Sequence, residues 1–155
     1  MPELTLKDAI DQTLAVIREG FEGPPEKWSY FTDSGPEAGL FGTLSRLDAA
    51  RASQKIGNTS IAAHVHHLIF GTEAVAAWIR GDREPRNWKD SWKVETVNDG
   101  EWKEMIESLR KSYGDIKKAI ESDGTKDIMS LGAAIGEAAH VAYHLGAIRQ
   151  KIAHL

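Results

Sequence analysis

Apolar residues recur at helical spacing over four long segments of this chain, and glycine or proline interrupts the pattern between them. This periodicity places helices at residues 6–20, 61–80, 101–121 and from 126 or 130 to 153. No segment shows the alternation that is typical of a strand. Four long amphipathic helices must bury their apolar faces against one another, so the sequence predicts an all-α fold, a four-helix bundle.

Turn and capping residues set the expected ends of these helices. Thr5 is a candidate N-cap of the first helix, and Asp8, three residues later, can complete a capping box. The proline- and glycine-rich residues 24–42 are expected to be irregular and to lead into a short helix within 40–56. Residues 81–100 are expected to form a long loop, and long loops in compact domains are often functional.

Length and composition narrow the class of protein. The 155 residues fit one domain, residues 1–155, and the absence of cysteine excludes disulfides, thiolate metal sites and cysteine nucleophiles. The net charge is −4, and the scattered lysines and arginines form no basic patch for a nucleic acid. No run approaches the roughly 20 apolar residues that span a bilayer, and the N-terminus does not resemble a signal peptide. We therefore expect a cytoplasmic protein without membrane or nucleic-acid partners.

Five of the six histidines lie in the second and fourth predicted helices. At about 100° per residue, His64 and His67 lie together beside the apolar stripe of the second helix, whereas His66 points to the opposite, exposed side. In the fourth helix, His140 and His144 are four residues apart and therefore stand one turn above the other. The same two strips carry other residues, most of them small: Gly71, Ala74, Trp78, Ala133, Gly136 and Ala147. Small residues leave space beside the imidazole rings, as a site between helices requires.

The remaining positions follow from the same helical phase. The core stripe of the fourth helix is expected to comprise Leu131, Ile135, Ala138, Ala142, Leu145 and Ile152. Trp78 and Trp102 follow helical spacing and are expected in packing contacts, whereas Trp88 and Trp92 are candidates for a lid over a pocket. His154, near the C-terminus, is expected to be solvated.

Two histidines at positions i and i+4 of a helix can chelate one divalent ion. One further histidine, His64 or His67, would complete a three-nitrogen site, and helical phase does not choose between them. Three protein ligands leave coordination positions open for water or substrate, which is the arrangement of a catalytic metal. Glu137 lies along the strip of His140 and can either accept a hydrogen bond that orients a ring or act as a general base. The alternative is a set of core histidines that only form hydrogen bonds and hold no metal.

Two segments around these histidines resemble the DinB family, also described as DinB/YfiT-like metalloenzymes. They are residues 60–68, SIAAHVHHL, and residues 140–150, HVAYHLGAIRQ. The second segment is similar to the last-helix signature of the family, a His-x-x-x-His followed by a glycine and a glutamine-containing tail. Trp102, in a Glu-Trp start to the third helix, is a weaker match. The order of segments also agrees, so the resemblance covers essentially the whole chain.

The resemblance implies a specific fold and ligand set. The fold would be an up-down-down-up four-helix bundle, usually a homodimer. Family ligands in the second helix precede a leucine or valine, which selects His67, so the implied metal ligands are His67, His140 and His144. Relatives include transferases of low-molecular-weight thiols. The implied function is a metal-dependent enzyme that acts on a small molecule, of thiol S-transferase or hydrolase type.

The expected cofactors and the alternative function are considered next to this resemblance. The ion is expected to be Zn²⁺ or Ni²⁺, with Fe²⁺ or Mn²⁺ as further candidates, because imidazole suits several of these metals. A low-molecular-weight thiol is implied by family analogy alone, since no residue of the chain matches a thiol site. The alternative function is a non-catalytic module, either a metal-dependent sensor or a dimeric scaffold. It is motivated by the lack of a clear second catalytic group beyond Glu137.

Overall fold

The computed structural model describes residues 3–25, 27–35 and 37–155. Over these ranges the chain is all-helical, with six α-helices, one 3-10 helix and no strand. The elements are α1 (Leu6–Glu22), α2 (Leu40–Leu44), α3 (Ala49–Ser53), α4 (Ile61–Arg80), η1 (Trp88–Trp92), α5 (Asp99–Asp123) and α6 (Ile128–Ile152). The all-α prediction is confirmed. Most of the predicted irregular segment 24–42 lies before α2, which includes its last residues, 40–42; positions 26 and 36 are outside the described residues.

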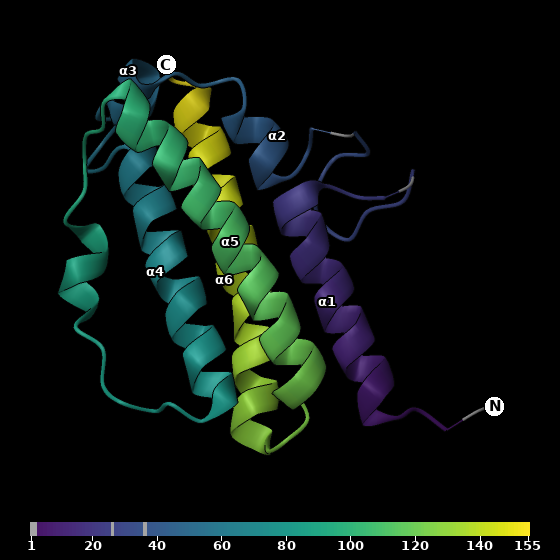
Figure 1. Cartoon of the computed structure of the whole chain (residues 1–155). Coiled ribbons are helices and arrows are strands. Elements are labelled where there is room, and N and C mark those ends of the chain that lie inside the picture. The colour runs from purple at the N-terminus through teal and green to yellow at the C-terminus, as the bar shows by residue number, and fades with distance from the viewer. Residues whose placement is uncertain (1–2, 26, 36) are drawn as a thin grey trace.

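The four long helices α1, α4, α5 and α6 lie side by side (Figure 1). Helix α4 packs against both α5 and α6, and α6 also packs against α1. The short helices α2 and α3 lie at the end of the molecule that also holds the C-terminus (Figure 1). Helix α6 therefore packs between α4 and α1, and contact with these two helices determines which of its side chains are buried.

Side-chain caps begin the long helices where the sequence places capping residues. The Thr5 hydroxyl accepts from the backbone N–H of Asp8 at 3.2 Å, and the Asp8 carboxylate accepts from the backbone N–H of Thr5 at 2.8 Å, which confirms the predicted capping box. Ser60 caps α4 in the same way through the N–H of Ala63. Such a cap contributes about 1 kcal/mol to the stability of a helix, and it fixes the residue at which the helical phase begins.

The short helix expected within residues 40–56 is two helices, α2 and α3. The break occurs because Asp48 acts as a new N-cap, with its side chain accepting from the backbone N–H of Arg51 at 2.8 Å. The prediction of one helix was wrong. The pattern of apolar residues continues across the turn between α2 and α3, but the helical backbone ends at Leu44 and starts again at Ala49.

The apolar stripe predicted for the last helix is also wrong in part. Ile135 is 54% exposed, and the side chains that α6 buries are Ser130, Ala134, Glu137, Val141, His144, Leu145 and Ile148. Helix α6 is rich in alanine, glycine and isoleucine over its whole circumference, so hydrophobicity defines its phase weakly. Packing against α1 and α4 sets the buried side instead, and it turns Glu137 inward.

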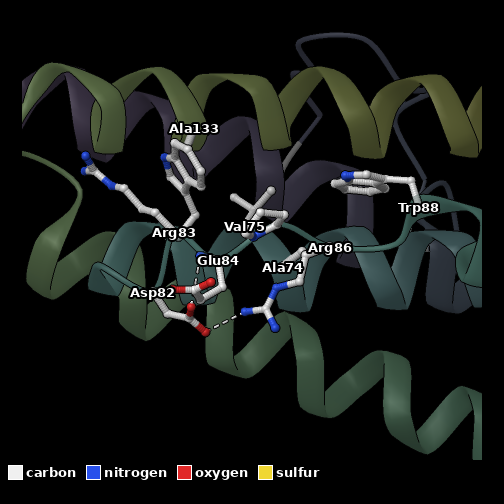
Figure 2. Close-up of a pocket in the computed structure, with 10 residues that line it drawn as sticks. Ala74, Val75, Asp82, Arg83, Glu84, Arg86, Trp88 and Ala133 are labelled. Atoms are coloured by element: carbon white, nitrogen blue, oxygen red, sulfur yellow. Dashed lines mark hydrogen bonds and ion pairs between the residues drawn. The ribbon is translucent and has the colours of Figure 1, made fainter.

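The connection from α4 to α5 runs beside α4 and contains the 3-10 helix η1, which packs on α4. The first part of this connection, with side chains from α4 and α6, lines a cavity of about 390 Å³ (Figure 2). The sequence predicts a long loop over residues 81–100, and the structure adds a helical turn at its centre and begins α5 at Asp99. Asn98 and Glu101 form the capping box that starts α5 earlier than apolar periodicity suggests.

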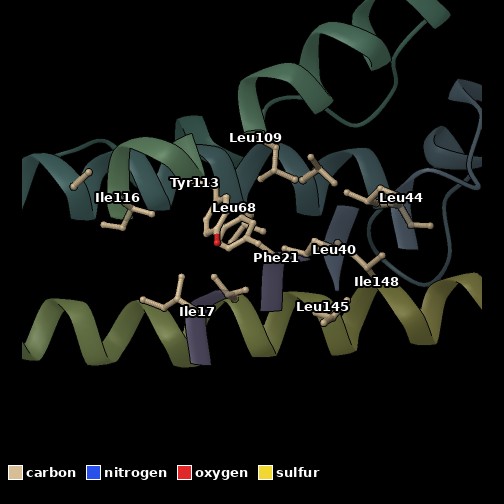
Figure 3. Packing of buried hydrophobic residues seen from close by; sticks show 14 of the residues in the cluster. Ile17, Phe21, Leu40, Leu44, Leu68, Leu109, Tyr113, Ile116, Leu145 and Ile148 are labelled. Atoms are coloured by element: carbon tan, nitrogen blue, oxygen red, sulfur yellow. The ribbon is translucent and has the colours of Figure 1, made fainter. Parts of the chain in front are cut away.

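The hydrophobic core lies where α1, α4, α5 and α6 meet (Figure 3). Phe21 and Tyr113 stack at its centre with ring centroids 4.5 Å apart. Trp102 is buried and donates its indole N–H to the carbonyl of Leu47 at 3.0 Å, so the prediction of a packing role is confirmed. Other core residues are Ile17, Leu40, Leu44, Leu68, Leu109, Ile116, Leu145 and Ile148. This core holds α4 and α6 in fixed register, which positions the histidines that the two helices carry.

Candidate metal centre

Three histidines meet where α4 faces α6. His67 comes from α4, and His140 and His144 come from α6. One ring nitrogen of each lies within 4.8 Å of the other two, and the three ring centroids are 4.7 to 5.4 Å apart. The structure thus brings together the three residues that the sequence suggests as ligands. A group of this size is close enough to share one metal ion after small movements of the rings.

Gly71 lets the two helices approach at this point. A Cβ atom built on Gly71 would lie 2.4 Å from Cε1 of His140, far inside van der Waals contact. The sequence suggests that small residues leave space beside the imidazoles, and Gly71 does so. Gly136 does not, because it is exposed and a Cβ there would meet no atom of the described residues within 4 Å.

Ser91 of η1 holds the ring of His67. The Ser91 hydroxyl donates to the carbonyl of Trp88 at 2.6 Å, so at 2.7 Å it accepts the Nδ1–H of His67. Because Nδ1 carries the proton, Nε2 of His67 keeps its lone pair. The indole of Trp92 stacks on the same ring, with centroids 4.1 Å apart and planes 18° from parallel. Residues from η1 therefore fix both the tautomer and the plane of His67.

His64 holds the ring of His144. The Nδ1 atoms of the two rings are 3.0 Å apart, and Nε2 of His64 is 3.1 Å from the hydroxyl of Thr59. Two ring nitrogens at this distance share one proton. A proton on Nδ1 of His144 leaves its Nε2 free, and His64 can then donate its own Nε2–H to Thr59. Of the two histidines that helical phase leaves open, His67 joins the three-nitrogen group and His64 supports His144 from behind.

Glu137 lies beside the third ring. Its carboxylate has no exposed surface; Oε1 accepts from the hydroxyl of Thr72 at 2.6 Å, and Oε2 lies 3.5 Å from Nδ1 of His140. Among the residues that the structure describes, Oε2 has no hydrogen-bond partner. A buried carboxylate is costly unless positive charge or donors surround it. A divalent cation on the far side of His140 would supply that charge, so the residues present fit a metal ion.

Burial favours the neutral form of the His64, His67 and His144 rings. Burial, together with the charge of neighbouring histidines, lowers the pKa of His67 to about 4 and that of His144 to about 3. Burial likewise lowers the pKa of His64 to about 4, together with the nearby charge of Lys151. Only the neutral imidazole binds a metal, and at neutral pH no proton needs to be displaced from these rings.

A comparison with protein families places the chain in a family. The family model of the DinB superfamily matches residues 10–148 of the 155. The chain belongs to the DinB superfamily. Among curated proteins none matches the chain significantly, and among solved structures none does either.

In this DinB-superfamily chain, η1 covers one side of the histidine group. Trp92 is 38% exposed and Trp88 is 50% exposed, and Trp88 lies with its ring centroid 6.2 Å from that of His67. Of the two tryptophans predicted as a lid, Trp88 lines the cavity next to this site and Trp92 stacks on His67. His67 and His140 remain half-buried, so solvent still reaches the group.

Some contacts around the site could not be predicted from helical phase. His66 is half-buried rather than exposed, because its Nδ1–H donates to the carbonyl of Ser91 at 2.7 Å and anchors η1. Ser91, Thr72 and Thr59 carry no signal in the sequence beyond the position of Ser91 between two tryptophans. His154 is exposed, as expected. Over the described residues, the helices are all too short or too polar to cross a membrane.

Proposed function

We propose that this DinB-superfamily protein is a metal-dependent enzyme that acts on a small molecule, with a divalent ion bound by His67, His140 and His144. One observation carries the proposal: Nδ1 of each ring faces a different partner, which leaves Nε2 of all three for a common ion. The ion is Zn²⁺ or Ni²⁺, and imidazole ligands also suit Fe²⁺ or Mn²⁺.

The bound ion would act as a Lewis acid that lowers the pKa of a water or thiol at its open positions. The residues of the chain orient it. Ser91 fixes His67, and His64 fixes His144. We assign Glu137 to positioning His140, since a carboxylate with no exposed surface has no path to a substrate and cannot serve directly as its base. Trp92 and Trp88 exclude water from one side.

The reaction is of thiol S-transferase or hydrolase type, with a low-molecular-weight thiol as co-substrate in the first case. Superfamily membership supports this assignment. In a transfer, the thiolate attacks the electrophilic atom of the substrate and the leaving group departs with the electron pair. In a hydrolysis, water takes the place of the thiol. The two are separated by whether turnover requires an added thiol.

A non-catalytic role, as a metal-dependent sensor or dimeric scaffold, is the second candidate. The burial of Glu137 favours it, because that carboxylate was the one candidate for a general base. Turnover of an electrophile that disappears with a chelator and returns with added metal would exclude it. Absence of turnover with every thiol, in protein that retains its metal, would support it.

The proposed fold and assembly are a single domain over residues 1–155, an up-down-down-up four-helix bundle and a homodimer. The colour gradient of Figure 1 supports the topology, since α1 and α6 run upward and α4 and α5 downward. An exposed apolar face of α6 supports the dimer, and it includes Ile128, Met129, Ile135 and Tyr143. Light scattering of the native chain and of Ile135→Glu tests it: a mass near twice 17.1 kDa that halves in the variant is expected.

Metal analysis tests the site itself. We expect close to one divalent ion per chain after purification, and its loss in His144→Ala. The control is His154→Ala, because His154 is exposed and its ring forms a hydrogen bond with the carbonyl of Gln150, away from the site. Full occupancy in His144→Ala would refute the ligand assignment.

A further inference from the structure

A cavity of about 390 Å³ lies beside the metal centre without including any of its histidines. Figure 2 shows Ala74 and Val75 of α4 and Ala133 of α6 along it, the charged residues of the connection after α4 towards one end, and Trp88 at the other. The ring of Trp78 completes the apolar wall. A cavity of this volume is at the lower end of the range for small-molecule pockets, and it suits a ring or a short chain.

Trp88 connects the cavity to the metal centre. It lines the cavity, and its ring centroid is 6.2 Å from that of His67. The helices give the spacing: Ala74 follows His67 by seven residues, and Ala133 precedes His140 by seven. At 1.5 Å per residue, both alanines lie about 10 Å from the ligands along their helices. The part of the cavity lined by the two alanines therefore lies roughly two helical turns from the histidines, at the same α4–α6 interface.

Both arginines at the charged end of the cavity are paired with carboxylates of the chain. Arg83 donates to Asp127 at 2.7 Å, and Arg86 donates to Asp82 at 2.6 Å. Arg83 also lies over the ring of Trp78, 5.2 Å from its centroid. Because each guanidinium has a carboxylate partner, neither arginine offers a free positive charge to an anion, and the remaining charged residue of this end, Glu84, is an exposed side chain. Recognition must come from the apolar wall of alanine, valine and tryptophan.

We propose that this cavity binds an apolar arm, an aryl group or a short alkyl chain, of the substrate whose reactive group is at the metal. The inference rests on the proposed metal-dependent function and adds the substrate class to it. The substrate is an elongated molecule with about 10 Å between its reactive atom and its apolar end. Ala133 and Ala74 determine the depth of the pocket, since a larger side chain at either position would fill it.

Chelating probes of graded length test the proposal on the zinc-loaded protein. Acetohydroxamate reports the metal alone, and phenylalkyl hydroxamates of increasing chain length extend from the ion towards the cavity. Calorimetry should show affinity that rises at least about tenfold once the phenyl group spans about 10 Å. Affinity that does not depend on chain length would overturn the proposal.

A cavity-filling variant tests whether the gain in affinity of the long probe comes from the pocket. Ala133→Phe should remove the gain of the long probe and leave acetohydroxamate binding unchanged, which also reports an intact fold. Ala133→Leu provides a milder filling if the larger ring prevents folding. Ala50→Phe, at an exposed position of α3, is the matched control and should keep the full gain. An equal gain in Ala133→Phe and wild type would overturn the pocket assignment.

A second measurement tests the pocket independently of the metal site. If acetohydroxamate does not bind the wild type, the metal centre is refuted, and 4-phenylbutanol is then titrated into metal-free protein. Movement of the indole N–H resonances of Trp78 and Trp88 would support an apolar pocket. The Trp102 resonance is the internal reference, because that ring is buried against Leu47. No movement of the Trp78 and Trp88 signals would overturn the pocket.

Discussion

Replacing Gly71 by alanine should weaken metal binding although alanine is the better helix former. At an unconstrained helix position, glycine to alanine stabilises a protein by about 1 kcal/mol. At Gly71 the new methyl group would lie 2.4 Å from Cε1 of His140, whereas ordinary contact begins near 3.4 Å. The imidazole must therefore retreat by about 1 Å, or α4 and α6 must separate.

The size of this ring displacement determines how much metal affinity Gly71→Ala is expected to lose. Zinc–nitrogen bonds are about 2.0 to 2.1 Å long and tolerate deviations of about 0.2 Å. A ring displaced by about 1 Å no longer serves as a ligand in the same site. Loss of a residue that only orients a ligand costs roughly 10- to 100-fold in metal affinity, and displacing the ligand itself should cost about 100-fold or more.

Competition with a chromophoric chelator measures the metal affinity of Gly71→Ala. The matched control is Gly114→Ala in α5, because a Cβ at Gly114 meets nothing within 4 Å. The control should bind metal as the wild type does and gain about 1 kcal/mol, or roughly 3 °C in Tm. Metal-free Gly71→Ala should gain nothing, because the clash offsets the helix preference. Wild-type metal affinity in Gly71→Ala would refute both the close approach and the role of His140.

Other predictions concern the partners of the rings and the effect of pH. Ser91→Ala removes the acceptor of the His67 Nδ1–H and should weaken metal binding by roughly 10- to 100-fold in the same chelator competition; an unchanged affinity would contradict its orienting role. Glu137→Gln should stabilise the metal-free protein, because it removes a buried charge, and should reduce the rise in Tm on adding Zn²⁺. A less stable metal-free variant would show that the carboxylate is satisfied without the ion. Saturating metal at about 100 times Kd should stabilise the wild type by about 2.7 kcal/mol, and a chelator should reverse the shift in thermal unfolding. Metal-free protein should lose stability as the pH falls from about 6.5 towards 4, because the unfolded chain takes up protons on its histidines while the folded pKa values of His64 and His144 are about 4 and 3. Urea unfolding at pH 7 and pH 4.5 measures this loss, and His64→Asn should show a shallower pH dependence than the wild type.

The orientation of the three rings depends on several separate elements. Ser91 comes from η1, His64 from α4 and Glu137 from α6, and each reaches the Nδ1 side of a different ligand. The rings of His67 and His144 are therefore held by hydrogen bonds before a metal arrives, which reduces the entropy lost on binding. The same arrangement couples η1 to the site, so a substrate that moves Trp88 or Trp92 would also move the support of His67.

The sequence alone determined the helices and the ligand candidates. Periodicity and capping residues predicted the all-α fold, the capping box of Thr5 and Asp8, and the facing pair His140 and His144. These features depend on residues within a few positions of one another, where the geometry of the helix is fixed. Resemblance to the DinB family added His67, which spacing could not separate from His64.

Tertiary packing decided the rest. It turned Ile135 outward and Glu137 inward, because contact with α1 and α4, rather than the weak apolar pattern of α6, selects the buried face. It placed Ser91 behind His67 and the cavity beside Trp88, two features that join residues far apart in the chain. Local periodicity carries no information on which distant side chain fills the space beside a ring. That depends on how closely two helices approach, and at this site Gly71 sets the distance.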